Sequence, residues 1–263
     1  MIAKILGDSK KIVIKIGSNT IANEDGSICK DYLENLAKQI NILRDHNKQI
    51  VIVSSGARIA GVGTLGKWMR KEDIHYKQAL CAIGQVELMD AYRRILGEWG
   101  IHIGQMLLTR DDFADEHRTL NIRNTLFTLV DEGVIPIINE NDTVSVEEIK
   151  IGDNDTLAAL TANLWNADLL ILFSDIDGLY DKNPKTHKNA KLLEEVRDID
   201  KILETIEIGE VNSFGTGGIS TKITAARTVN NYGTPMVLAN GKKNDILIKL
   251  FEGKERATVF LAD

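Results

Sequence analysis

The sequence predicts an α/β protein, an αβα sandwich with a largely parallel central sheet. Its apolar runs, rich in Ile and Val, are short and almost unbroken, which is typical of strands buried on both faces of a parallel sheet. Each run is followed by a helical pattern, and this alternation places helices on both faces of the sheet. With 263 residues, 43% of them hydrophobic, the chain can form one large domain over residues 1–263.

The predicted elements follow from the spacing of the apolar residues. Seven Ile- and Val-rich runs are expected to form strands, at 12–16, 50–53, 101–108, 134–138, 169–173, 235–238 and 257–261. Five stretches have helical apolar spacing, at 32–43, 74–98, 119–131, 155–165 and 221–231. In the first helix, Leu33, Leu36, Ile40 and Leu43 recur every three or four residues and therefore share one face.

Three segments between or within these elements carry weaker signals. Gly84 marks a point where the long helix over 74–98 could bend. Residues 61–66 match Gly-x-Gly-x-x-Gly, but this match does not directly follow its strand. We therefore interpret 61–66 as a flexible loop over the site and reject a dinucleotide-binding turn. Residues 176–200 are more polar and less periodic, which favours a hairpin or loop excursion.

Composition excludes several classes of protein. The net charge of −6 argues against a general nucleic-acid binder, because affinity for a phosphate backbone needs clustered Lys and Arg. No run of 18 apolar residues occurs, and the N-terminus lacks a signal-peptide core, so we expect a cytoplasmic protein without a membrane span. Cys29 and Cys81 are far apart and show neither metal-ligand nor CxxC spacing.

The most informative motif is the octet Gly215-Thr-Gly-Gly-Ile-Ser-Thr-Lys222, which opens a helical stretch. Its glycines let several backbone N–H groups point in one direction, and the helix start adds unpaired N–H groups. Lys222 lies one turn into the helix and adds a full positive charge. These features favour a phosphate-binding site, and the alternative is a glycine turn before an ordinary helix. The octet is not a P-loop, because Gly-x4-Gly-Lys-Ser/Thr does not occur in the chain.

Lys15 lies near the end of the first predicted strand, which runs into Gly17 and Ser18. A strand lysine is often on an edge or an exposed face. In a central strand buried on both faces, however, its ammonium group must meet an anion. Gly17 and Ser18 would let the backbone approach a ligand closely.

Other predicted strands end in polar residues, and in an open α/β sheet such ends meet at one rim. Segment 54–57 is Ser-Ser-Gly-Ala, which either caps a helix or holds a small anion. Segments 139–142 and 151–155 are acidic and rich in amides. Asp153-Asn154-Asp155 could cap a helix, or the acidic groups could orient lysines, bind an ammonium group or support magnesium. Segment 174–180 is either a turn or a nucleotide-binding loop.

Seven segments, in order along nearly the whole chain, resemble the amino-acid kinase family. The segments are 13–18, 52–57, 104–110, 138–142, 151–155, 174–180 and 215–222. The resemblance implies an amino-acid kinase fold and ATP-dependent phosphorylation of the side-chain carboxylate of L-glutamate, the first committed step toward proline. The N-terminal part of the domain would bind the amino acid and the C-terminal part would bind ATP.

The resemblance also implies roles for the matching residues. Lys15 and Lys222 would flank the transferring phosphoryl group, and Asp155 would hold both lysines in position. The residues that would bind glutamate are Ser55, Asp142 and Asn154. The residues that would bind ATP are Lys15, Ser174, Asp175, Thr216, Gly217, Gly218, Ile219, Ser220, Thr221 and Lys222. Mg²⁺ would accompany ATP, and no residue is assigned to hold a metal.

The chain departs from the family pattern in three ways. Many relatives have Thr at the position of Ser174 and Met at that of Ile219. Many also carry a C-terminal PUA domain, which this chain is expected to lack. The expected partners are L-glutamate, ATP and further copies of the chain, as a dimer or tetramer, with feedback inhibition by proline. No nucleic acid or membrane is expected.

Two other functions remain open. An N-acetylglutamate kinase-like enzyme would use the same fold, but Asp142 favours a substrate with a free ammonium group. A non-catalytic sensor of nucleotide or amino acid is the alternative from another class. Retention of Lys15, Lys222 and Asp155 argues against a sensor, because a binder needs no charges that act on a transition state.

Overall fold

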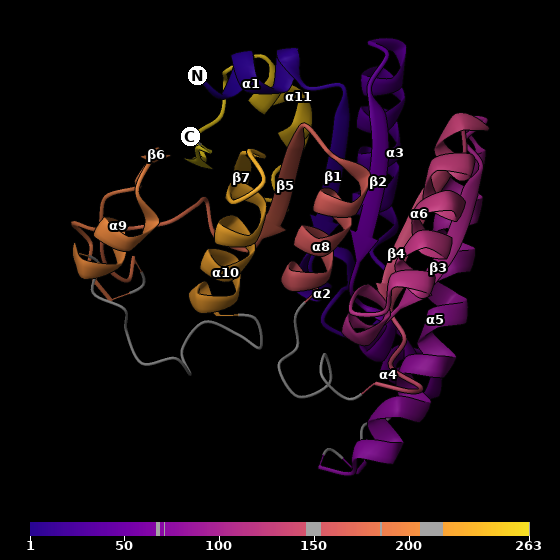
Figure 1. Cartoon of the computed structure of the whole chain (residues 1–263). Coiled ribbons are helices and arrows are strands. Elements are labelled where there is room, and N and C mark those ends of the chain that lie inside the picture. The colour runs from indigo at the N-terminus through magenta and orange to yellow at the C-terminus, as the bar shows by residue number, and fades with distance from the viewer. Residues whose placement is uncertain (67–68, 71, 146–153, 185, 206–217, 263) are drawn as a thin grey trace.

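The structure is a computed structural model, and it describes residues 1–66, 69–70, 72–145, 154–184, 186–205 and 218–262 (Figure 1). Its strands are β1 Lys11–Ile16, β2 Gln49–Ser54, β3 Ile103–Leu108, β4 Ile135–Glu140, β5 Leu169–Ser174, β6 Glu195–Val196, β7 Met236–Asn240 and β8 Thr258–Phe260. Its α-helices are α1 Ile2–Asp8, α2 Ser18–Ile21, α3 Lys30–Asp45, α4 Ala57–Leu65, α5 Ile74–Gly97, α6 Glu116–Asp131, α8 Asp155–Trp165, α9 Ile199–Thr205, α10 Ile219–Asn230 and α11 Ile246–Phe251. A short 3₁₀ helix, η1, covers Arg110–Phe113.

Within the described residues the strands form one eight-stranded sheet in the order β3-β4-β2-β1-β5-β7-β8-β6. The neighbours from β3 to β7 pair in parallel, and β8 pairs antiparallel with β7. Strand β1 is central, so that Lys15 lies in register between Val53 of β2 and Leu172 of β5. The largely parallel sheet predicted from the unbroken apolar runs is confirmed.

Helices cover both faces of this sheet and give the three layers seen in Figure 1. Alternate residues of β1 point to opposite faces. Ile12 and Ile14 enter a core that α1, α3, α5 and α11 close, and Val13 enters a second core that α6, α8 and α10 close. The αβα sandwich is therefore confirmed. Among the described residues, none of the helices combines the length and apolarity needed to cross a membrane.

All seven predicted strands and all five predicted helices are present in the described part of the chain, with ends that differ by a few residues. For residues 176–200, predicted as a hairpin or a loop excursion, the antiparallel bridge between Tyr180 and Leu192 favours the hairpin. Periodicity did not reveal the short elements α1, α2, β6, α9 and α11.

The flexible loop predicted at 61–66 is wrong, because α4 continues to Leu65. Its glycines serve helix packing. A Cβ at Gly61 would lie 2.0 Å from the carbonyl oxygen of Leu80 in α5. Gly84 has the same role on α5, where a Cβ would lie 1.8 Å from the carbonyl oxygen of Ala57. Helix α5 runs through Gly84 without interruption, and the glycine lets two helix backbones touch.

Candidate active site

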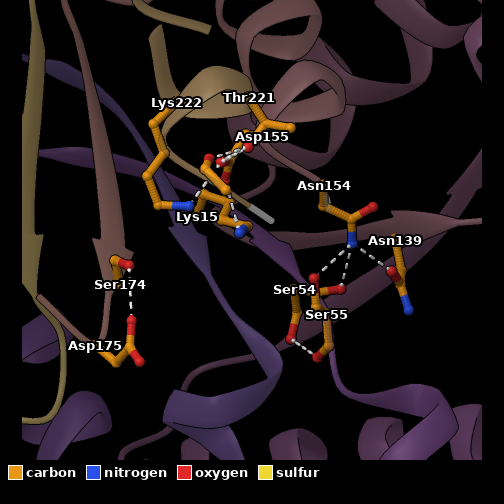
Figure 2. Close-up of polar contacts among 11 residues, drawn as sticks. Lys15, Ser54, Ser55, Asn139, Asn154, Asp155, Ser174, Asp175, Thr221 and Lys222 are labelled. Carbon is orange, nitrogen blue, oxygen red and sulfur yellow. Dashed lines mark hydrogen bonds and ion pairs between the residues drawn. The ribbon is translucent and has the colours of Figure 1, made fainter. Parts of the chain in front are cut away.

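The carboxyl ends of four parallel strands lie side by side at one rim of the sheet. They belong to β4, β2, β1 and β5, which are consecutive in the sheet order. The chain leaves β1 toward β2 on one side and returns with β5 on the other, which makes this rim the kind of switch point where α/β proteins bind ligands. Figure 2 shows two polar clusters there, one around Asp155 and one around Asn154.

The first cluster joins Lys15, Asp155 and Lys222. The Lys15 Nζ atom lies 2.7 Å from Asp155 Oδ1, and the Lys222 Nζ atom lies 3.2 Å from Asp155 Oδ2. The three residues are 5%, 0% and 6% exposed. The expectation that a central Lys15 meets an anion is confirmed by this ion pair.

In this cluster one carboxylate contacts two ammonium groups. Two ammonium groups held at one point favour an anionic ligand between them. Gly17 lies close to Lys15, since a Cβ at this position would lie 3.8 Å from Lys15 Nζ. The arrangement suits a phosphate group that touches both lysines.

The start of α10 adds backbone donors next to Lys222. Its N-cap residue is Gly218, which has no side chain that could cap the first turn. The Thr221 hydroxyl lies within hydrogen-bond distance of the Gly218 carbonyl oxygen, at 2.8 Å, and of Asp155 Oδ2, at 3.1 Å. Thr221 therefore ties the helix start to the carboxylate that holds both lysines.

The structure describes only part of the remaining residues that were predicted to bind ATP. Thr216 and Gly217 lie outside the described residues. In the same first turn, Ile219 is half-buried and Ser220 is exposed.

The second cluster is built around the side chain of Asn154, which is 1% exposed. Although Asn154 occupies the N-cap position of α8, its side chain makes no capping hydrogen bond. Its Nδ2 group donates to Asn139 Oδ1 at 2.7 Å, to Ser55 Oγ at 3.1 Å and to the Ser54 carbonyl oxygen at 3.2 Å. Its Oδ1 atom is buried without a hydrogen-bond partner among the described residues. The amide thus joins the ends of β2 and β4 and leaves one acceptor for a ligand.

The predicted alternative of simple capping by serine does not describe segment 54–57. The N-cap residue of α4 is Gly56, which has a φ of 111° and makes no side-chain cap. A φ in this left-handed region favours glycine. Ser55 Oγ instead accepts from Asn154, and its backbone N–H donates to Ile16 at the end of β1.

Asp142 lies just after β4 and is 6% exposed. Burial raises the pKa of its carboxyl from 3.8 to about 6, and a hydrogen bond from Cys81 and the nearby charge of Arg58 oppose this shift. Its Oδ1 atom has no hydrogen-bond partner among the described residues. A cavity of about 390 Å³ opens beside it, between α5 and the ends of β3 and β4. A buried carboxylate with an unused oxygen suits a cationic group of a ligand.

Ser174 and Asp175 lie at the end of β5, apart from the other two clusters (Figure 2). The Ser174 hydroxyl donates to Asp175 Oδ1 at 3.3 Å.

Asn139, which fixes the Asn154 amide, was not among the predicted site residues. Its position at the end of a buried strand was the available signal.

Comparisons with known proteins agree on one family. The model of the amino acid kinase family matches residues 10–240 of this chain. A glutamate 5-kinase of Alkaliphilus metalliredigens (strain QYMF) is 73% identical over 262 residues, which cover 100% of this chain and 99% of that protein. A glutamate 5-kinase of Alkaliphilus oremlandii (strain OhILAs) is 64% identical and covers 100% of both chains.

Solved structures show the same fold at low identity. A UMP kinase from Ureaplasma parvum superposes with a TM-score of 0.66 at 17% identity, over 96% of this chain and 99% of that chain. An isopentenyl phosphate kinase superposes with a TM-score of 0.63 at 19% identity, over 95% and 99% of the two chains. These two likenesses concern the fold.

Proposed function

Since this chain belongs to the amino acid kinase family, we propose that it transfers the γ-phosphoryl group of ATP to the side-chain carboxylate of L-glutamate. The activity is that of a glutamate 5-kinase, and its product, L-glutamyl 5-phosphate, begins the route to proline. One structural observation supports this function above the others. Two buried ammonium groups, Lys15 and Lys222, share the carboxylate of Asp155 beside the start of α10.

The reaction needs no general base. The side-chain carboxylate of glutamate is already ionised near pH 7, because its pKa is about 4.3. One of its oxygens attacks the γ-phosphorus, and the bond between this phosphorus and the β–γ bridging oxygen breaks. ADP leaves with the electron pair of that bond. The protein therefore contributes position and positive charge.

In the proposed mechanism Lys15 and Lys222 stabilise the negative charge of the transition state. In the transition state negative charge spreads over the oxygens of the phosphoryl group, and cations placed around them lower the barrier. Asp155 acts as a positioning residue that holds both ammonium groups through separate oxygens. The backbone N–H groups at the start of α10 would donate hydrogen bonds to further phosphate oxygens.

Mg²⁺ fits this site as a companion of ATP. Among the described residues no group of three or more His, Cys, Asp or Glu side chains could hold a metal ion. Mg²⁺ is commonly held by substrate phosphates and few protein ligands, so the phosphate oxygens would supply most of its contacts. When bound, it adds positive charge to those oxygens.

Asp142, Asn154 and Ser55 are the proposed glutamate-binding residues. The buried carboxylate of Asp142 would pair with the substrate ammonium group, and the unused Oδ1 of Asn154 would accept from a second donor. An acetylated amino group carries no positive charge and would leave Asp142 unpaired. This contact supports L-glutamate over N-acetylglutamate.

We further propose that the two halves of the sheet bind different substrates. The ends of β1, β2 and β4 would bind the amino acid, and those of β5 and β7 would bind ATP, with Ser174 and Asp175 near its nucleoside. The resemblance also supports a homo-oligomer, either a dimer or a tetramer, and a location in the cytoplasm. It further supports feedback inhibition of the enzyme by proline.

Incubating the pure protein with MgATP and single candidate acids tests this function. Release of ADP with L-glutamate, together with capture of the acyl phosphate by hydroxylamine, is expected. N-acetylglutamate, aspartate and carbamate should give little ADP. Thermal stabilisation by glutamate without any ADP release would contradict the proposal and favour a sensor.

A further inference from the structure

One face of helix α5 lies against the ends of β2 and β4. Three polar side chains on this helix are spaced by seven residues: Gln78, Gln85 and Tyr92. Seven residues are about two helical turns, so these side chains share one face. Gln78 and Gln85 make hydrogen bonds to segment 139–142 of the proposed glutamate site, and Tyr92 makes one to Ser54 at the end of β2.

The two outer residues hold backbone and hydroxyl groups of that site. The Gln78 Nε2 group donates to the carbonyl oxygen of Asp142 at 2.9 Å. The hydroxyl of Tyr92, which is completely buried, donates to Ser54 Oγ at 3.0 Å. Ser54 Oγ donates in turn to the carbonyl oxygen of Ser55 at 3.0 Å. These contacts restrain the backbone at the ends of β4 and β2.

The central residue, Gln85, begins a chain of amides. Asn139 Nδ2 donates to Gln85 Oε1 at 2.8 Å, while Asn139 Oδ1 accepts from the backbone N–H of Glu140 at 2.8 Å. The same Oδ1 accepts from Asn154 Nδ2 at 2.7 Å. Since a backbone N–H can only donate, it fixes which side of the Asn139 amide is the oxygen. The oxygen of Asn154 is consequently the atom left for a ligand.

While the Oε1 atom of Gln85 accepts this hydrogen bond, the other end of the same amide, the Nε2 group, has no such partner in the described part of the chain. Its Nε2 atom is buried without a hydrogen-bond partner among the described residues. A reversed Gln85 amide would place Nε2 against Asn139 Nδ2, where two donors would face each other. Without Gln85 Oε1, the Nδ2 group of Asn139, a residue that is 1% exposed, would lose this acceptor.

We propose that Gln78, Gln85 and Tyr92 form a positioning face that holds the glutamate-binding residues in their binding geometry. The three side chains act through Asp142, Asn139 and Ser54. Gln85 orients the Asn154 amide through Asn139. This inference rests on the proposed function, in which Asn154 binds L-glutamate.

The test is a set of initial-rate measurements in which L-glutamate and ATP are varied separately. Gln85→Met keeps the length of the side chain and removes its hydrogen-bonding groups. It should raise the KM for glutamate about tenfold or more, because a buried donor is left unpaired, and change the KM for ATP less than about twofold. Glu87→Met, on the exposed side of the same helix, is the matched control and should change neither constant.

A double-mutant cycle with Asn154→Ala tests the route of the effect. Asn154→Ala alone should raise the KM for glutamate, and Gln85→Met should then add less than about twofold, because the two residues act through one chain. If Gln85→Met fails to fold, Tyr92→Phe provides a second probe, since it removes only the hydroxyl group that holds Ser54. It should raise the KM for glutamate and leave that for ATP unchanged.

Three outcomes would overturn the inference. The first is an unchanged KM for glutamate in both folded Gln85→Met and folded Tyr92→Phe. The second is an equal rise in both KM values, which indicates general loosening of the structure. The third is full additivity with Asn154→Ala. If Asn154→Ala itself has no effect, the glutamate-site assignment fails as well, and this result is distinct from failure of the positioning face alone.

Discussion

Lys15 and Lys222 contact different oxygens of one carboxylate, that of Asp155, at 2.7 and 3.2 Å. The two lysines come from opposite ends of the chain, from the central strand β1 and from the first turn of α10. Asp155 begins α8, which packs between them. The fold thus gathers two ammonium groups at the rim of the sheet, where we propose that a phosphate binds.

Removing the shared anion should damage both stability and activity. Asp155→Asn removes the carboxylate that both buried ammonium groups contact, and breaking a buried ion pair in this way costs about 3–5 kcal/mol. Urea unfolding followed by circular dichroism would measure this loss, with Asp131→Asn on the exposed end of α6 as the control. Equal unfolding midpoints for the two variants would contradict the role assigned to Asp155.

Glutamate use should depend on pH through Asp142. Its pKa of about 6 means that the carboxyl becomes neutral as the pH falls below this value and can then no longer pair with an ammonium group. The kcat/KM for glutamate should therefore fall from pH 8 to pH 5 with a midpoint near 6. Asp142→Asn should have a low kcat/KM and lack this step. A step of the same size in Asp142→Asn would assign it to another group.

The same carboxyl should destabilise the protein without ligand. Because the folded pKa lies above the ordinary value of 3.8, ionised Asp142 is penalised above about pH 6, and the penalty disappears as the pH falls toward 4. Asp142→Asn should thus be more stable than the native chain at pH 8, by at most about 3 kcal/mol. Urea midpoints at pH 8 and pH 4.5 would test this, and an advantage of the same size at both pH values would exclude titration as the cause.

The contact between α4 and α5 should tolerate no side chain at Gly84. A Cβ there would lie 1.8 Å from the Ala57 carbonyl oxygen, so Gly84→Ala should destabilise the fold by about 1–3 kcal/mol. Gly97→Ala, at the end of the same helix with nothing within 4 Å, should be neutral or slightly stabilising. Thermal melting of both variants measures the difference, and equal melting temperatures would contradict the close helix contact.

Much of the fold could be predicted from periodicity, because burial on both faces of a parallel sheet leaves unbroken apolar runs such as 169–173. The ion pair of Lys15 could be anticipated for a similar reason. In a central buried strand an ammonium group has no contact with water and therefore needs an anion as its partner. By contrast, the second half of α4, from Gly61 on, was mistaken for a loop, because Gly61 and Gly63 lower helix propensity. Their value lies in contacts with other segments, which local sequence does not reveal.

The partners of polar side chains could not be predicted in the same way. Asn154 has the position and residue type of a helix cap, yet its amide binds Ser55 and Asn139 in two other segments. Gln85 and Tyr92 likewise belong to a helix whose apolar spacing was recognised, while their hydrogen bonds depend on strands distant in sequence. Such contacts follow from the packed fold, and only coordinates identify them.

The central claim is that the two ammonium groups around Asp155 stabilise phosphoryl transfer. Steady-state turnover of Lys222→Ala with saturating MgATP and L-glutamate tests it most directly, with Lys254→Ala at an exposed position as the control. We predict that Lys222→Ala, folded as shown by circular dichroism, loses kcat by about 10²-fold or more, while the control keeps normal turnover. Near-normal turnover of Lys222→Ala would contradict the claim.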